Sequence, residues 1–111
     1  MISNWNVESQ QRFSLLCKRM GDDVRILPIH LGLTMALLYH HNGDLFADCF
    51  HASRRKLMVF SGIKSVTTYH KYLTELVRYG YLAYTPSWHP TKASCFKFIE
   101  AEYNEQSNSL S

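Results

Sequence analysis

The sequence predicts an α+β fold in which helices come first and a β-hairpin comes last. Apolar residues recur every three or four positions before Gly80 and at every second position after it, as expected for helices and strands respectively. Glycine, proline and serine residues divide the first part of the chain into several short helices. The chain has 111 residues, of which 46% are apolar, so folding can bury the core of one domain.

Four helices are expected before Gly80. They cover residues 6–20, 29–41, 54–61 and 66–79. The first is expected to end at Gly21, and the second, which follows Pro28, should lie in the core because it is apolar around most of its circumference. Ser53 and Ser65 precede the third and fourth helices as N-caps, and Gly80 suits the left-handed residue that ends the fourth. The third helix is expected to bury Leu57, Met58 and Phe60.

The remaining elements are expected to be extended. A short strand at Phe50 and His51 is slightly favoured over a helical turn. Strands over residues 81–85 and 94–99 form a hairpin, joined by a loop at 86–93 that contains two prolines. This order of elements is that of a winged helix-turn-helix: a three-helix core plus a C-terminal β-hairpin wing, here with an extra N-terminal helix.

Three segments follow from this assignment. Residues 1–27 form the N-terminal helix and a linker, and residues 28–100 form the winged helix-turn-helix domain. Residues 101–111 are polar and are expected to form a flexible tail.

The helix predicted over residues 66–79 has an apolar side and a polar side. The side expected to pack against the preceding helices consists of Val66, Tyr69, Leu73, Leu76 and Val77. The polar side, together with Lys64 two residues before the helix, consists of Lys64, Thr67, Thr68, Lys71, Thr74, Glu75 and Arg78. Hydroxyl groups at a helix start, followed one turn later by a lysine, suit a helix that enters the major groove and contacts phosphates and base edges there. The dipole at the helix N-terminus also favours a phosphate.

The charge is concentrated in one part of the chain. Residues 53–97 carry eight lysines and arginines and one glutamate, a balance of +7, whereas residues 1–52 carry −1 and residues 98–111 carry −3. Arg54, Arg55 and Lys56 begin the third predicted helix, where their charge opposes the helix dipole and a phosphate backbone would stabilise it. The net charge of +3 therefore conceals a strongly basic half that predicts contact with a polyanion.

The loop over residues 86–93 is the expected wing. It contains Trp88, His89 and Lys92, which can contact phosphate or the minor groove. Trp88 can equally fold back onto the core, and the sequence does not choose between the two positions.

Residues 53–90 resemble the winged helix-turn-helix domains of transcriptional regulators found in Bacteroidetes, often with mobile genetic elements. The shared motifs are Ser53-Arg54 with Leu57-Met58, Ile63-Lys64-Ser65 with Thr68-Tyr69, Leu76 with Gly80-Tyr81-Leu82, and Pro86-Ser87 with Pro90. Residues 30–42 resemble the first helix of that group, so the likeness covers about two-thirds of the chain. The chain lacks the glycine usual near Lys92 or Ala93, and it has His40-His41 where the group has a tryptophan. The resemblance implies DNA binding.

These features predict sequence-specific binding of double-stranded DNA, in transcriptional regulation or a mobile-element function, without enzymatic activity and without a cofactor. The candidates for base contacts are Thr67, Thr68 and Lys71. The candidates for backbone contacts are Arg54, Arg55, Lys64, Arg78 and Lys92, and the predicted site also includes Ser65, Trp88 and His89. The alternative is a winged-helix module that binds a protein through the same helix, for which Thr67, Thr68 and Glu75 would be suitable.

Several other classes of protein are excluded by missing patterns. No segment has the roughly 18 continuous apolar residues of a membrane helix, and no signal peptide is recognisable. With an odd number of cysteines, this predicts a cytoplasmic protein in which Cys17, Cys49 and Cys95 are small buried hydrophobic residues. The spacings typical of metal ligands, nucleophilic serines and phosphate-binding glycine loops are absent, so neither a metal site nor a catalytic site is expected.

The N-terminal helix is a candidate dimer contact, because winged helices that recognise palindromes act as dimers. Trp5, Phe13, Leu16 and Met20 can pack in trans to form a homodimer, or they can pack across their own domain. The sequence leaves both possibilities open.

Overall fold

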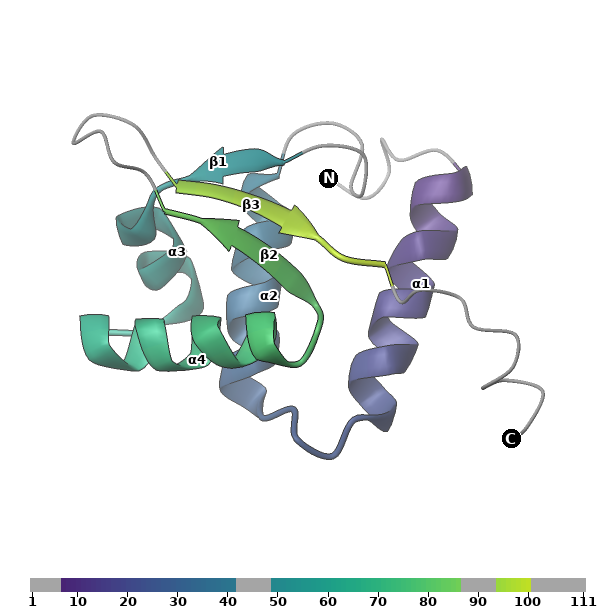
Figure 1. Cartoon of the computed structure of the whole chain (residues 1–111), viewed down its shortest axis with the longest axis horizontal. Helices are drawn as coiled ribbons and strands as arrows, with labels where there is room; N and C mark the ends of the chain where they lie inside the picture. The colour runs from purple at the N-terminus through teal and green to yellow at the C-terminus, as the bar shows by residue number, and fades with distance from the viewer. Residues whose placement is uncertain (1–6, 42–48, 87–93, 101–111) are drawn as a thin grey trace.

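The computed structural model describes residues 7–41, 49–86 and 94–100. In these residues four helices and a three-stranded antiparallel sheet make up an α+β fold, which confirms the predicted class (Figure 1). The elements are α1 (Val7–Asp22), α2 (Pro28–His40), β1 (Phe50–Ala52), α3 (Arg54–Ser61), α4 (Val66–Arg78), β2 (Leu82–Thr85) and β3 (Ser94–Phe98).

The helix α3 begins and ends where the sequence predicts, and α4 begins where predicted and ends at Arg78, one residue early. The Ser53 hydroxyl accepts a hydrogen bond from the backbone N–H of Lys56 at 3.1 Å, and the Ser65 hydroxyl accepts one from Thr68 at 3.3 Å. Each bond satisfies an N–H group that the helix itself leaves without a partner. Gly62 after α3 has a φ of 77°, a left-handed conformation that residues with a Cβ rarely adopt.

Two details of the predicted helices are wrong. Gly21 does not end α1, because its φ is not positive and the helix continues to Asp22, whose carboxylate pairs with Lys18 one turn earlier at 3.3 Å. Phe60 is 45% exposed rather than buried, because α3 turns Leu57 toward the core and leaves Phe60 at its edge.

Fewer residues on the apolar side of α4 are buried than predicted. Tyr69, Leu73 and Leu76 are buried, but Val66 and Val77 are exposed because they lie at the margins of this stripe.

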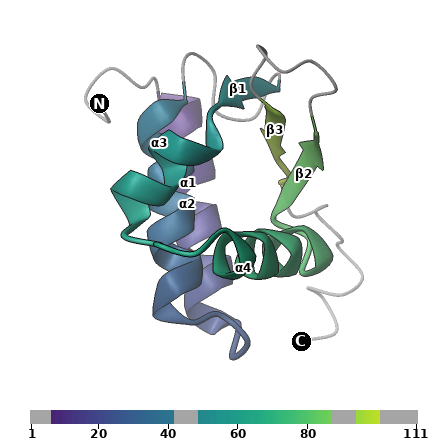
Figure 2. The ribbon, with the colours of Figure 1, turned by 90° about the vertical axis from the view of Figure 1, so that its left-hand side faces the viewer.

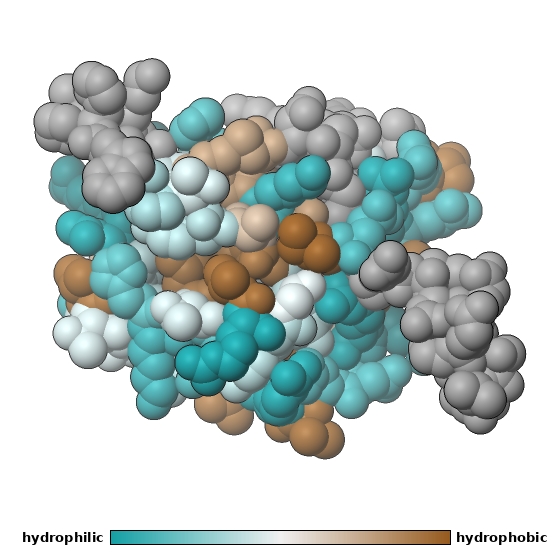
Figure 3. Space-filling view, viewed as in Figure 1, coloured by the Kyte–Doolittle hydropathy of each residue, from teal (hydrophilic) through white to brown (hydrophobic). Residues whose placement is uncertain are grey.

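The sheet has the strand order β1-β3-β2, so β3 is its central strand. Phe96 of β3 lies opposite Phe50 on β1 and Tyr84 on β2, and these rings face the helices as part of the core. His51, opposite Cys95, is exposed on the other face. Figure 2 shows the sheet on one side of the molecule, α2 on the other and α4 across one end. The space-filling view of the sheet side shows apolar side chains over the strands and hydrophilic ones over α1 (Figure 3).

The helix α2 lies at the centre of the helical layer, as predicted, and packs against both α3 and α4. A close approach to α3 occurs at Gly32, where a Cβ would lie 3.8 Å from the carbonyl oxygen of Ser61.

The helix α1 is attached to the other end of the domain by Arg19, which donates hydrogen bonds to the carbonyl oxygens of Gly80 and Ile99. In α1, Leu16 and Met20 are buried in their own chain and Phe13 packs against the core. Of the residues proposed as a dimer contact, Trp5 lies outside the described residues.

The cysteines differ from their predicted role as buried hydrophobic residues. Cys49 is exposed, Cys95 is half-buried, and the two form a disulfide that joins the start of β1 to β3. Their Cα atoms are 5.9 Å apart, a separation that a disulfide spans. Cys17 on α1 is exposed and free. The alternation of side chains along a strand explains the pairing, because it brings Cys95 to the outer face of the sheet rather than into the core.

Candidate nucleic-acid interface

The predicted DNA-contacting residues that the structure describes lie on α3, on α4 and in the turn between them. Seven of them are exposed and Thr68 is half-buried: Arg54, Arg55, Lys64, Ser65, Thr67, Thr68, Lys71 and Arg78. The other three predicted residues, Trp88, His89 and Lys92, lie outside the described residues, as does the rest of the expected wing beyond Pro86.

The helix α4 presents one continuous polar stripe. Thr67, Lys71, Thr74 and Arg78 follow one another at intervals of four, three and four residues, and all are exposed. At 100° per residue these side chains lie within a narrow sector of the helix, opposite the buried Tyr69 and Leu76. The exposed polar stripe is 12 residues long and is available for contact with a groove of a partner.

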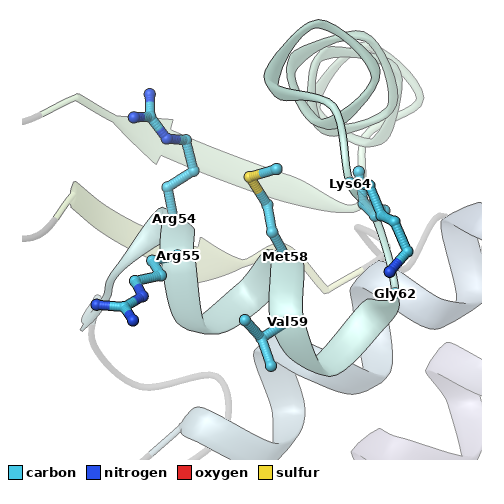
Figure 4. A pocket seen from close by; sticks show the side chains of 7 residues that line it. Arg54, Arg55, Met58, Val59, Gly62 and Lys64 are labelled. Atoms are coloured by element: carbon cyan, nitrogen blue, oxygen red, sulfur yellow. The ribbon is translucent and has the colours of Figure 1, made fainter.

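The start of α3 and the turn before α4 border a shallow hollow (Figure 4). Its volume is about 410 Å³, and its lining includes Arg54 and Arg55 on one side and Lys64 on the other. In Figure 4 the two arginine side chains extend outward from the first turn of α3, and the side chain of Lys64 extends from the turn beyond Gly62. Three cationic groups therefore surround one open surface.

These cations differ in their partners from Arg12, Lys18 and Arg25. On α1 and in the linker that follows, Arg12 pairs with Glu8 and Glu100, Lys18 pairs with Asp22, and Arg25 pairs with Asp23 at 2.8 Å. Among the described residues, no carboxylate lies within ion-pair distance of the basic side chains of α3, α4 or their turn, which are Arg54, Arg55, Lys56, Lys64, Lys71 and Arg78. The first turns of α3 and α4 also contain no acidic residue. Their positive charge is therefore not neutralised within the described part of the chain.

Glu75, predicted to lie on the polar side of α4, is instead bound to a residue of α2. Its carboxylate accepts a hydrogen bond from Nε2 of His30 at 2.7 Å, and it is half-buried against α2. His30 is fully buried, and its Nδ1 accepts a hydrogen bond from the backbone N–H of Leu27 at 2.8 Å, so the ring proton lies on Nε2. The rings of Tyr72 and Tyr79 pack edge-on against this imidazole. This buried pair connects the start of α2 to the middle of α4, and sequence reasoning did not identify it.

No group of three His, Cys, Asp or Glu side chains within residues 7–41, 49–86 and 94–100 is arranged to hold a metal ion. No helix there has the length and the apolar character needed to cross a membrane.

Comparison of the chain with models of protein families, with curated proteins and with solved structures finds no match.

Proposed function

We propose that the chain is a winged helix-turn-helix protein that binds double-stranded DNA, with α4 in the major groove and the loop over residues 86–93 as the wing. The order α2, β1, α3, α4, β2, β3 supports this proposal, as does the short turn between α3 and α4. The resemblance of residues 53–90 to regulators associated with mobile genetic elements supports it further. The protein would then act in the cytoplasm, in transcriptional regulation or a mobile-element function, and not as an enzyme.

One observation carries the proposal: six basic residues on α3, on α4 and in their turn have no carboxylate partner in the described structure, and two of them belong to the exposed stripe of α4. Unpaired cations on one surface repel one another, and a phosphate backbone both relieves this repulsion and releases its counterions on binding. The chain pairs Arg12, Lys18 and Arg25 with carboxylates on α1 and in the linker, but among the described residues it places no carboxylate beside the six basic residues. Hydration of the surface alone would not be improved by this arrangement.

The positions of the residues suggest a division of roles. Thr67 and Lys71 are exposed near the start of the α4 stripe, where a helix in the major groove meets base edges. Thr68 is half-buried and its backbone N–H is bound to Ser65, so we expect it to contribute less. Contacts to the phosphate backbone are proposed for Arg54, Arg55, Lys64, Arg78 and, from the wing, Lys92.

The alternative, a protein-binding module that uses the same helix, has lost one of its candidate residues. Glu75 would have supplied an acceptor to a partner protein, but its carboxylate is already bound to His30. The basic residues that remain on this side of the molecule favour a polyanion.

Fluorescence anisotropy with a labelled duplex pool of random sequence, followed by selection of the bound sequences, tests the proposal. If about five phosphates are neutralised, the plot of log K against log salt should have a slope of about −4.5. Arg55→Ala should reduce the magnitude of this slope by about 0.9 and weaken all duplexes alike, whereas Lys71→Ala should chiefly reduce discrimination between selected and random duplex. Lys18→Ala removes the same charge from α1 and should change neither property. Absence of binding at low salt, or binding that is indifferent to salt, would overturn the proposal.

A further inference from the structure

The helix α2 has an apolar face that the described structure covers only in part. Its 13 residues include no Asp, Glu, Lys or Arg, and it is apolar on all sides. A helix of this kind is usually surrounded by other elements. Yet Leu31, Met35 and Tyr39, spaced every four residues, are 46%, 40% and 56% exposed. We refer to these three residues as the α2 stripe.

The α2 stripe is the centre of a larger apolar surface. Toward α3, the ring of Tyr39 stacks on Phe60 at 4.8 Å, and His40 packs edge-on against both rings. Toward α1, Leu31 and Met35 border a groove of about 220 Å³, whose other wall includes residues of α1. The surface therefore extends from α1 across α2 to α3, and it contains no charged side chain along α2.

We propose that this surface is the contact between two copies of the chain, with the α2 stripe of one copy packed antiparallel on the α2 stripe of the other. The dimer itself does not depend on the proposed function. The location differs from the dimer contact predicted on the N-terminal helix, because Leu16 and Met20 of that helix are buried within their own chain.

Charge is the first argument for a second copy as the occupant. A twofold interface brings each surface against itself, so like charges meet across it. The basic surface of α3 and α4 cannot form such an interface without repulsion, because its cations have no carboxylate partners in the described structure. The α2 stripe carries no charge and meets its own copy at no electrostatic cost.

Area and spacing give the second argument. The exposed parts of the α2 stripe and Phe60 amount to roughly 400 Å² per copy, about half of a standard interface of ~800 Å² per partner. Side chains at intervals of four residues form the ridges through which two helices pack. Met35 lies at the middle of the stripe, so in an antiparallel pair it meets Met35 of the other copy.

The arrangement is compatible with two DNA-reading helices on one side of a dimer. The amino-terminal ends of α3 and α4 lie at the same end of the molecule, at the left in Figure 1, and the α2 layer lies opposite the sheet in Figure 2. A twofold axis in the plane of the α2 stripe, directed toward that end, would present both α4 helices to one duplex. Such a dimer would favour half-sites about 34 Å apart, a consequence that rests on the proposed function.

Sedimentation equilibrium of the full chain without DNA tests the dimer separately from DNA binding. The protein concentration is varied from about 1 to about 200 µM, the order of magnitude at which such interfaces form. In this range we expect a mass twice the monomer's 12.9 kDa. Met35→Glu should weaken the dimer at least tenfold because it places two carboxylates face to face. Val24→Glu introduces the same charge at a 96% exposed residue outside the surface and should leave the dimer intact.

A mixing experiment tests the antiparallel arrangement itself. Met35→Glu and Met35→Lys should each be monomeric and folded, as judged by circular dichroism, because Met35 is a partly exposed residue. Mixed in equal amounts they should form a heterodimer, since the two opposite charges then face each other. A wild-type chain that is monomeric throughout, equal weakening by Val24→Glu, or no association of the mixed variants would overturn the proposal.

Discussion

His30 is fully buried and uses both of its ring nitrogens. Nδ1 accepts the backbone N–H of Leu27 and Nε2 donates to Glu75, so one side chain caps the start of α2 and fixes α4 beside it. In a chain that binds DNA through α4, this pair would hold the helix in place from a position beside its exposed stripe. Burying a polar group without a hydrogen-bond partner costs free energy. Removing either His30 or Glu75 should therefore destabilise the fold, because the other residue would lose its partner.

Replacing Glu75 by two different residues should separate the hydrogen bond from the charge. Glu75→Gln keeps an oxygen acceptor for Nε2–H and should lower the free energy of unfolding only slightly. Glu75→Leu leaves a buried N–H group without a partner and should cost about 1–3 kcal/mol. Urea denaturation followed by circular dichroism measures both values. Equal losses for the two variants would show that the hydrogen bond does not stabilise the contact between α2 and α4.

Asp23 in the linker between α1 and α2 should make stability depend on pH. Hydrogen bonds from the Arg25 guanidinium and from the Tyr81 hydroxyl hold the pKa of Asp23 well below its usual range. The folded state therefore keeps this carboxylate ionised where the unfolded state binds a proton. Its contribution is present above about pH 4, the pKa of an unfolded Asp, and is lost as the pH falls further. Asp23→Asn should flatten the acid side of a plot of unfolding free energy against pH, and an unchanged slope would contradict this assignment.

Tyr81, which is bound to Asp23, should make the stability of the fold depend on pH at high pH as well. Burial, with a smaller contribution from its bond to Asp23, raises the pKa of Tyr81 to about 12. Because the folded state holds this proton more tightly than an unfolded tyrosine does, stability is complete below about pH 10 and declines as the pH rises toward 12. Burial raises the pKa of Tyr69 to about 12 as well, so Tyr81→Phe should remove part of the alkaline decline and not all of it.

At the scale of the elements, the helix boundaries around the α3–α4 turn depend on short polar residues and on glycine. Replacing glycine by alanine should therefore change the free energy of unfolding in opposite directions at two positions. Gly62→Ala should lower the free energy of unfolding by roughly 1–2 kcal/mol, because a φ of 77° strains a residue with a Cβ although no atom lies within 4 Å of it. Gly21→Ala, in a helical conformation with equally open space, should raise it by up to about 1 kcal/mol. Thermal unfolding of the two variants would contradict this account if both shifts had the same sign.

Local signals were sufficient to predict most of the elements. The start of α3 at Arg54 and of α4 at Val66 follows from serine caps, and β3 follows from alternation around Phe96. What could not be predicted depends on contacts between elements. A helical wheel places Glu75 near the polar side of α4, and only the position of α2 shows that it is bound to His30. Likewise, the pairing of Cys49 with Cys95 depends on how β1 and β3 align.

At the scale of the whole molecule, the chain separates its charges and closes its sheet with one covalent link. Arg12, Lys18 and Arg25, on α1 and in the following linker, pair with carboxylates, whereas the six basic residues of α3, α4 and their turn have no carboxylate partner in the described structure. The link between Cys49 and Cys95 spans 46 residues and encloses β1, α3, α4 and β2, and so includes the two helices that carry the proposed DNA surface. In a reducing cytoplasm this bond would be open much of the time, so the stability of the proposed DNA surface would depend on the redox state.

The oxidised chain should therefore be more stable than the reduced one. Closing a loop of 46 residues restricts the unfolded chain and should stabilise the folded state by about 4 kcal/mol on chain entropy alone. Urea denaturation with and without dithiothreitol measures the difference, and Cys49→Ser should reproduce the reduced chain under both conditions. Cys17→Ser is the matched control, because Cys17 is free and exposed on α1 and should not alter the response to the reductant. A midpoint that dithiothreitol does not shift in the wild-type chain would contradict a stabilising link, since the enclosed helices would then hold their positions without it.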